Sequence, residues 1–94
     1  MIKRKGDIKI NDLIENIDKL HTTELGAERI KRNLQIETDN IVSWCRTQIL
    51  NKDARINRQG KNWYATVGGC KITVNAHSYT IITAHKVKEL FRMH

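Results

Sequence analysis

The hydrophobic pattern changes its period once along the chain, at Asp53, and this change constrains the fold more than any other feature of the sequence. Before Asp53, apolar residues recur every three or four positions, which is the spacing of amphipathic helices. After it, apolar and polar residues alternate, which is the spacing of strands with one buried face. The sequence therefore predicts a single α+β domain over 1–94, with helices over about 7–52 and a β-meander over about 54–85.

The helical half divides into three amphipathic segments. The first has its apolar residues at three- and four-residue steps from Ile10 to Leu20. The second runs from Glu24 to Leu34 after a turn with a capping hydroxyl, although Gly26 weakens its first turn. The third spans roughly residues 39 to 51 and follows a run of N-capping residue types. These segments predict three N-terminal helices, each with one apolar face to bury.

The β half contains four strand-like segments separated by short turn signals. The segments are Ala54–Arg58, Lys61–Val67, Cys70–Asn75 and Ser78–His85. The dipeptides Gln59-Gly60 and Gly68-Gly69 are typical of two-residue hairpin turns, and Ala76-His77 is a weaker signal. The order of the segments predicts an antiparallel meander.

Two-residue turns at all three positions fix one register for the predicted sheet. The register pairs Ile56 with Trp63, Ala65 with Ile72, Val67 with Cys70, Trp63 with Val74, Val74 with Tyr79, and Ile72 with Ile81. Every pair is apolar, and a one-residue slip in any strand would invert its pattern. We therefore expect the three helices to pack on this one face.

The opposite face of the predicted sheet is polar and contains no carboxylate. Its members are Arg55, Asn57, Asn62, Tyr64, Thr66, Lys71, Thr73, Asn75, Ser78 and Thr80. A solvated sheet face explains the alternation completely. It does not explain why acids are absent while Arg55, Lys71 and an exposed tyrosine are present. A ligand-binding face and a plain solvated face both remain open.

The positive charge is concentrated in the same half of the chain. With 17 Lys and Arg against 10 Asp and Glu, the net charge is +7, of which residues 1–53 carry +1 and residues 54–94 carry +6. Such an excess favours a polyanionic partner such as RNA, DNA or anionic lipid. The candidate nucleic-acid contacts are Arg55, Lys61, Tyr64, Lys71, Lys86 and Lys88.

Several classes of protein are excluded or disfavoured. No apolar run approaches the length of a membrane span, and neither a signal peptide nor a lipidation motif is visible, so a cytoplasmic protein without membrane contact is expected. No nucleotide-binding loop or dinucleotide fingerprint is present, and no cofactor is expected. The four histidines do not have metal-ligand spacing, so no metal is expected. Cys45 and Cys70 fit reduced core thiols better than a disulfide or a zinc site.

Two histidines are candidates for acid–base chemistry. His21 lies where the first helix gives way to the second, upstream of Arg29 and Arg32, and an imidazole with two guanidinium groups can combine proton transfer with phosphate stabilisation. A histidine at the negative end of a helix is also favourable for structural reasons alone. His85 ends the last strand, where the strand fixes a side chain that a ligand can still reach. Alternation places His85 on the helix-facing side, so it is either a functional residue or part of the rim of the core.

The end of the chain has apolar residues at Val87, Leu90 and Phe91 among basic neighbours. This spacing predicts a short C-terminal helix within residues 86–94. Docking of this helix onto the domain is favoured over membrane binding, which requires a longer amphipathic face.

Three segments together resemble a small family of bacterial and phage-borne proteins of about this length, a domain family of unknown function. The segments are LHTTELGAERIKRNL from Leu20, GKNWY from Gly60 and SYTIITAHK from Ser78. The resemblance covers nearly the whole chain and implies no activity.

More distantly, helices followed by a four-stranded antiparallel meander are similar to the ribonuclease superfamily that includes barnase, colicin ribonucleases and the RelE- and BrnT-type toxins. That resemblance implies metal-independent RNA cleavage and a protein partner such as an antitoxin. Carried over by position, the catalytic candidates are His21, Arg29, Arg32, Thr83 and His85.

Two hypotheses follow. The first is a small basic RNA-directed protein, with RNA favoured over DNA, that acts as a metal-independent ribonuclease of toxin type. The second is a non-catalytic module that binds nucleic acid or protein through its basic β half. Convergence of His21 and His85 on one phosphate would favour the first hypothesis.

Overall fold

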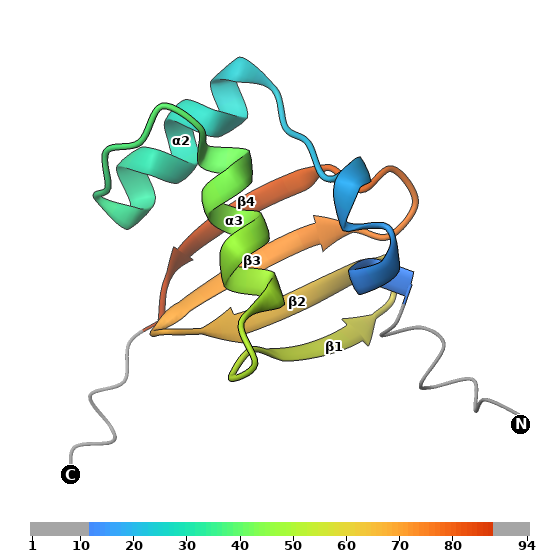
Figure 1. Ribbon diagram of the computed structural model, residues 1–94. Helices are drawn as coiled ribbons and strands as arrows, with labels where there is room; N and C mark the ends of the chain where they lie inside the picture. The colour runs from blue at the N-terminus through green and yellow to red at the C-terminus, as the bar shows by residue number, and fades with distance from the viewer. Residues whose placement is uncertain (1–11, 88–94) are drawn as a thin grey trace, which may run out of the picture.

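The chain forms three helices and one four-stranded antiparallel sheet within residues 12–87, the part that the computed structural model describes (Figure 1). The helices are η1 (Ile17–Lys19), α2 (Glu24–Leu34) and α3 (Ile41–Leu50). The strands are β1 (Arg55–Gln59), β2 (Asn62–Val67), β3 (Cys70–Asn75) and β4 (Ile81–Lys86), and they lie in the sheet in chain order. The predicted α+β class with an antiparallel sheet is confirmed.

The two longer helices begin at the capping residues that the sequence offers. The Oγ1 of Thr23 accepts a hydrogen bond from the N–H of Gly26 at 3.0 Å, and the Oδ1 of Asn40 accepts one from the N–H of Ser43 at 2.9 Å. Each bond satisfies a backbone donor that the helix itself leaves unpaired. As a result α2 has its predicted bounds, and α3 is slightly shorter than the predicted range.

The described part of the first predicted helix is less regular than its apolar stripe indicates. Residues 12 to 15 are helical, the backbone turns at Asn16, and η1 follows as a 3-10 helix. The N–H and the side-chain amide of Asn16 both donate to the carbonyl of Asp12, at 3.0 and 2.8 Å. Leu13 and Leu20 are nevertheless buried, so the stripe marks the side that faces the core. The part of this prediction before residue 12 lies outside the described residues.

Gly26 has a packing role in the first turn of α2. A Cβ at this position would lie 2.5 Å from the Oγ1 of Thr22, which donates a hydrogen bond to the carbonyl of Ile81 at 3.1 Å. The glycine therefore leaves room for a threonine that fastens the start of α2 to β4. This contact explains why a residue of low helix propensity is placed here.

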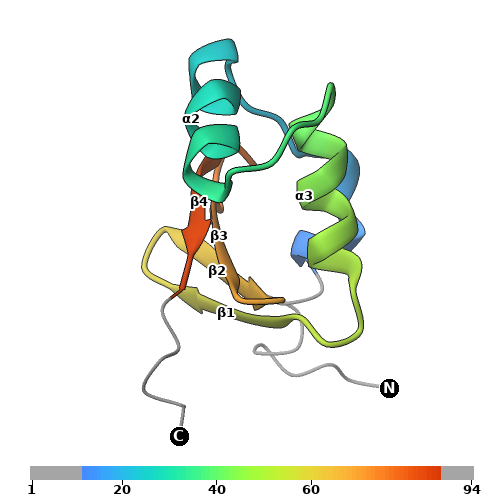
Figure 2. The same ribbon diagram turned by 90° about the vertical axis from the view of Figure 1, so that its left-hand side faces the viewer.

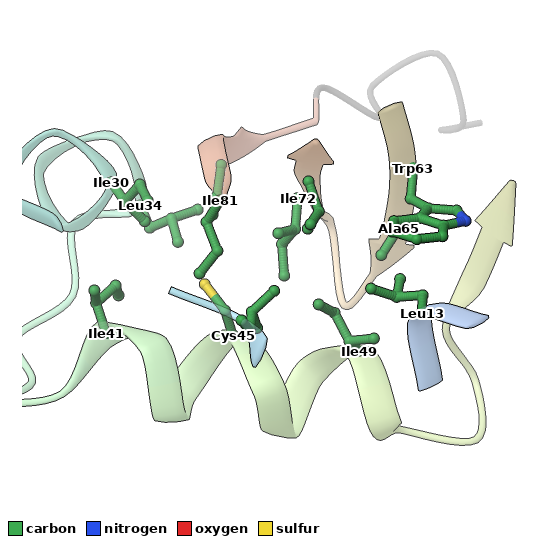
Figure 3. Close-up of a cluster of buried hydrophobic side chains, with 13 residues drawn as sticks. Leu13, Ile30, Leu34, Ile41, Cys45, Ile49, Trp63, Ala65, Ile72 and Ile81 are labelled. Atoms are coloured by element: carbon green, nitrogen blue, oxygen red, sulfur yellow. The ribbon is translucent and has the colours of Figure 1, made fainter. Parts of the chain in front are cut away.

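One hydrophobic core lies between the helices and one face of the sheet. α3 lies over this face, and α2 packs beside β4 at the edge of the same core (Figure 2). Figure 3 shows Cys45 of α3 pointing toward Ile81 of the sheet and Ile49 of α3 also pointing toward the sheet, with Ile30 of α2 at the side. The largest fully buried side chains are Trp63, Leu13, Ile30, Leu34, Ile49, Ile72, Ile81, Val74 and Cys45.

The register of the first hairpin differs from the prediction by two residues. Ile56 lies opposite Ala65, and Arg58 lies opposite Trp63, because the turn consists of Gly60 and Lys61 rather than Gln59 and Gly60. The two-residue hairpin turn requires a positive φ at its first central position, and Gly60 supplies it with a φ of 59°. A shift of two residues preserves the faces, so Ile56 still points toward the core side. The second hairpin has the predicted register throughout.

The third hairpin departs from the prediction more strongly. Its loop is longer than the predicted Ala76-His77 turn, because the Oδ1 of Asn75 accepts hydrogen bonds from the N–H groups of His77 and Ser78, at 2.9 Å each. The ladder then shifts between Thr73 and Val74, so Ile82 is an extra residue without a partner in β3. The predicted pairs of Val74 with Tyr79 and of Ile72 with Ile81 are therefore wrong.

The outer edge of β4 is covered by residues from the helical half. The chain at His21 pairs with Thr80 as a short parallel bridge, and the N–H of Ile81 donates to the carbonyl of His21 at 2.8 Å. The side-chain amide of Asn33 in α2 donates to the carbonyl of Ala84 at 3.3 Å. These contacts occupy backbone groups that an edge strand would otherwise expose.

The region of the predicted C-terminal helix begins with sheet structure. Lys86 is the last residue of β4, and the N–H of Val87 donates to the carbonyl of Gly69 at 2.8 Å. The remainder of that prediction, residues 88 to 94, lies outside the described residues.

Candidate nucleic-acid interface

The face of the sheet opposite α3 carries no helix within residues 12 to 87 (Figure 2). We call it the helix-free face. The register and the alternation of the strands assign to it Arg55, Asn57, Gln59, Asn62, Tyr64, Thr66, Lys71, Thr73, Asn75, Thr83 and His85. All of these residues are polar, as predicted. Of the predicted members, Ser78 and Thr80 lie before β4 rather than in a strand, and Gln59, Thr83 and His85 belong to the face in addition.

One row across all four strands of the helix-free face carries three basic side chains. Arg55 of β1 pairs with Thr66 of β2, Thr66 pairs with Lys71 of β3, and Lys71 pairs with His85 of β4. Neighbouring strands lie about 4.8 Å apart, so the row extends over roughly 14 Å. Arg55 and His85 are exposed and Lys71 is half-buried. This row brings together residues that are up to 30 positions apart in the chain.

Tyr64 lies in the neighbouring row, beside the basic one. The Nζ of Lys71 lies 5.7 Å from the centroid of the Tyr64 ring, and the side-chain amide of Asn62 donates to the Tyr64 hydroxyl at 3.4 Å. A ligand on this face would therefore meet an aromatic ring and a positive charge at one place. Thr73, the next residue in this row, is buried beneath its neighbours.

The electrostatic environment of this face is uniformly positive or neutral. No Asp or Glu occurs between Ala54 and Val87, so no carboxylate of the strands or their turns opposes the basic side chains. Within the described residues, the one ion pair of the chain joins Lys31 and Glu28, both on α2. Within residues 12–87, none of the cations of the helix-free face forms an ion pair with a carboxylate.

The prediction that His85 lies on the helix-facing side is wrong. The extra residue Ile82 shifts the alternation of β4, so Ile81 and Ala84 face the core while Thr83 and His85 lie on the helix-free face. The fold therefore groups Thr83 and His85 with Lys71 rather than with the helices. The adjacent apolar residues Ile81 and Ile82 interrupt the alternation of this strand, and this interruption is the sequence signal of the bulge.

The remaining basic candidates lie at different places. Lys61 is exposed in the turn between β1 and β2. Lys86 pairs with Cys70 in the register, and its Nζ donates to the Oε1 of Gln35 at the end of α2 at 2.9 Å. Lys86 therefore belongs to the helix side of the sheet. Lys88 lies outside the described residues.

His21 is held by hydrogen bonds on both ring nitrogens. Its Nδ1 lies 2.9 Å from the carbonyl oxygen of Lys19, and because a carbonyl can only accept, Nδ1–H is the donor. Its Nε2 lies 3.1 Å from the hydroxyl of Thr80, which in turn lies 2.7 Å from the hydroxyl of Ser78. These bonds fasten the end of η1 to the sheet, which is a structural role for the imidazole.

The structure does not bring His21 and His85 together. His21 pairs with Thr80 just before β4, whereas His85 lies near the other end of that strand. Five residue steps along the chain separate Thr80 from His85, which corresponds to roughly 16 Å in a strand. The two imidazoles therefore do not flank one phosphate in this structure.

The two arginines of α2 are both exposed but have different surroundings. Arg29 lies one helical turn before Asn33, which contacts β4, so it is on the β4 side of α2. Arg32 lines a shallow pocket with three carboxylates, those of Glu28, Glu37 and Asp39. Acidic neighbours make the position of Arg32 unfavourable for a phosphate.

Arg58 and His77 are two further functional candidates that the sequence alone does not single out. They line one pocket together with Lys61, Asn75 and Ala76. His77 lies near Arg58 and Lys61 because of the conformation of the loop after β3. The side chain of Asn75 fixes this conformation through its hydrogen bonds. The asparagine at the end of a strand is the signal that would have indicated an ordered loop.

The cysteines are free thiols, with Cys45 buried in the core and Cys70 half-buried. Burial raises the pKa of the Cys45 thiol to about 12. Among residues 12–87, no three His, Cys, Asp or Glu side chains cluster as a metal site would require. None of the helices in this stretch has the length and hydropathy to cross a bilayer.

Comparison with known proteins assigns the chain to a protein family. No curated protein and no solved structure matches it significantly. A family model described as "Protein of unknown function (DUF3781)" matches residues 14–85, which include η1, α2, α3 and nearly all of the sheet. Because this match covers most of the chain, the protein belongs to the DUF3781 family.

Proposed function

We propose that this protein binds single-stranded RNA on the helix-free face of its sheet. The observation that carries the proposal is the row of Arg55, Lys71 and His85 beside Tyr64 on strands that contain no carboxylate. Phosphate contacts by Lys and Arg supply most of the affinity of such interfaces. A nearby aromatic ring adds stacking that depends little on base identity.

The polar side chains of this face support RNA as the nucleic acid. Thr66 presents a hydroxyl group between Arg55 and Lys71, and Asn57 presents an amide group opposite Tyr64. These groups can pair with bases and 2′-hydroxyls. An open sheet suits unpaired nucleotides, because their bases can lie flat against side chains of the strands. The exposed Ile82 adds apolar surface near the β4 edge.

The proposal is for binding rather than cleavage. A metal-independent ribonuclease needs an acid and a base on opposite sides of one phosphate. His21 and His85 are near opposite ends of β4, and both ring nitrogens of His21 are engaged in hydrogen bonds. The non-catalytic hypothesis therefore fits the arrangement better.

The test is a binding measurement with a labelled single-stranded RNA at several salt concentrations. We expect Lys71→Gln to weaken binding and to flatten the dependence of log K on log salt by about 0.7, the value for one phosphate contact on a single strand. Tyr64→Leu should weaken binding by about five- to 150-fold through lost stacking. Lys52→Gln is the matched control, because Lys52 is exposed in the turn before β1 and carries the same charge.

Two results would contradict this proposal. One is an absence of salt-sensitive RNA binding, and the other is an equal loss of affinity in Lys71→Gln and Lys52→Gln. Incubation of the same RNA with the protein in a metal chelator tests cleavage separately. We expect intact RNA, whereas cleavage that His21→Ala or His85→Ala abolishes would restore the ribonuclease hypothesis.

A further inference from the structure

A pocket of about 460 Å³ lies where the turn between β1 and β2 meets the loop between β3 and β4. Its lining residues are Arg58, Lys61, Asn75, Ala76 and His77. Three of these five carry cationic or titratable basic groups, and none of the described lining residues is acidic. The pocket therefore has the composition of an anion site.

The backbone brings the two turns together in a fixed arrangement. The N–H of Ala76 donates to the carbonyl of Lys61 at 2.7 Å, which joins the loop after β3 to the turn before β2. The Oδ1 of Asn75 accepts hydrogen bonds from the N–H groups of His77 and Ser78. These three bonds place His77 beside Lys61 although 16 positions separate them in the chain.

Arg58 is held in place on the β1 side of this pocket. Its Nε–H donates to the carbonyl of Gly60 at 2.9 Å, and its guanidinium carbon lies 5.5 Å from the centroid of the Trp63 ring. These contacts use one N–H of the guanidinium and leave its terminal amino groups for another acceptor. No ion pair links Arg58 to a carboxylate within residues 12–87.

We propose that this pocket binds a terminal phosphate monoester. A guanidinium can donate two parallel hydrogen bonds to phosphate oxygens, and the lysine and histidine supply further positive charge and donors. The volume exceeds that of a phosphate group alone and suits a ligand with a nucleoside attached. The phosphate belongs either to a free mononucleotide or to the end of an RNA strand.

The location of the pocket connects it to the helix-free face. Asn75 lines the pocket and also ends the outermost row of that face, in which it pairs with Asn62. Lys71 lies four residues earlier on the same strand, at roughly 13 Å. Arg58 pairs with the core residue Trp63 and so lies on the helix side of the sheet, and a strand bound on the helix-free face reaches the pocket by passing over the sheet end at Asn75. Binding of a phosphorylated RNA end in the pocket rests on the proposed function, whereas binding of a free mononucleotide does not.

The test compares matched ligands with and without a terminal phosphate. One pair is AMP and adenosine, and the other is one RNA oligonucleotide with a 5′- or 3′-phosphate or with hydroxyls at both ends. We expect phosphate to tighten binding in at least one pair by about tenfold or more, as charge-assisted hydrogen bonds do. A gain for AMP indicates a mononucleotide site, and a gain for the oligonucleotide alone indicates a site for an RNA end.

Variants of the pocket show whether the gain arises there. Lys61→Gln and Arg58→Gln should each reduce the gain to less than about threefold, while Lys52→Gln retains it. Lys61 is exposed in a turn, so Lys61→Gln keeps the test valid even if Arg58→Gln disturbs the packing on Trp63. An equal gain in Lys61→Gln and Lys52→Gln would overturn the assignment.

The outcomes also separate this proposal from the one before it. RNA binding that depends on Lys71 but not on a terminal phosphate, together with equal binding of AMP and adenosine, overturns the pocket alone. A phosphate gain for AMP without any RNA binding supports the pocket and overturns the proposed RNA interface.

Discussion

Cys45 lies at the centre of the core, and its burial makes it the less reactive of the two thiols. Its side chain points from α3 toward the sheet between helices and strands (Figure 3). Burial raises its pKa to about 12, with a smaller contribution from Cys70. Burial also raises the pKa of Cys70, although the ammonium group of Lys86 opposes this effect. The thiolate is the reactive form, so burial protects Cys45 more strongly than Cys70.

We expect a thiol reagent at pH 8 to label one cysteine in the native protein and two in denaturant. Cys70→Ser should remove the fast native labelling, whereas Cys45→Ser should leave it. Fast native labelling that Cys45→Ser removes would show that Cys45 is accessible.

The burial of Cys45 also predicts a pH dependence of the free energy of unfolding. This free energy should fall as pH rises from the ordinary thiol pKa of 9.0 toward about 12, because only the unfolded chain ionises Cys45 in that range.

Individual residues show how far strand alternation alone can assign a face. Arg55, Tyr64 and Lys71 lie on the face that alternation predicts, because β1, β2 and β3 contain no irregularity. His85 lies on the opposite face from its prediction, because one unpaired residue, Ile82, precedes it in β4. The error arises from a longer loop and a bulge, which the assumption of a two-residue turn and strict alternation leaves out.

At the scale of elements, the three turns differ in how much of their geometry the sequence determines. Gly68-Gly69 forms the predicted two-residue turn, since both residues have positive φ. Gly60 also has positive φ, but glycine suits either central position of a hairpin turn, so the first register was off by two residues. The conformation of the third turn depends on the side chain of Asn75. Its length, and therefore the register of β4, could not be derived from the residues that flank it.

We expect Asn75→Ala to destabilise the protein by about 1–2 kcal/mol, because it removes an acceptor for the N–H groups of His77 and Ser78. Asn57→Ala is the control, since Asn57 is exposed on β1, and its effect should stay within about 0.5 kcal/mol. Thermal unfolding measures both, with a shift of roughly 4–8 °C per kcal/mol for a domain of this size. Equal stability of the two variants would show that the side chain of Asn75 does not hold the loop.

At the scale of the whole molecule, residues 12–87 form three helices and one four-stranded antiparallel sheet, and this α+β class could be predicted from the change in hydrophobic period. The positions of His21 and His85 in the fold could not be predicted in this way. His21 contacts Thr80 across 59 positions of the chain, through a parallel bridge that has no sequence signal. The distribution of charge indicated the location of the candidate site better than the individual histidines did, because the segment without Asp or Glu coincides with the sheet.

The most direct test of RNA binding by the helix-free face compares two double variants that each remove two positive charges. Arg55→Gln with Lys71→Gln alters the helix-free face, and Arg32→Gln with Lys52→Gln alters exposed positions outside it. The measurement is the affinity for single-stranded RNA at several salt concentrations. We predict that the first pair weakens binding by about tenfold or more and flattens the salt dependence by about 1.4, while the second pair changes neither appreciably. An equal loss in both pairs, or a larger loss in the second, would contradict the assignment of RNA binding to the helix-free face.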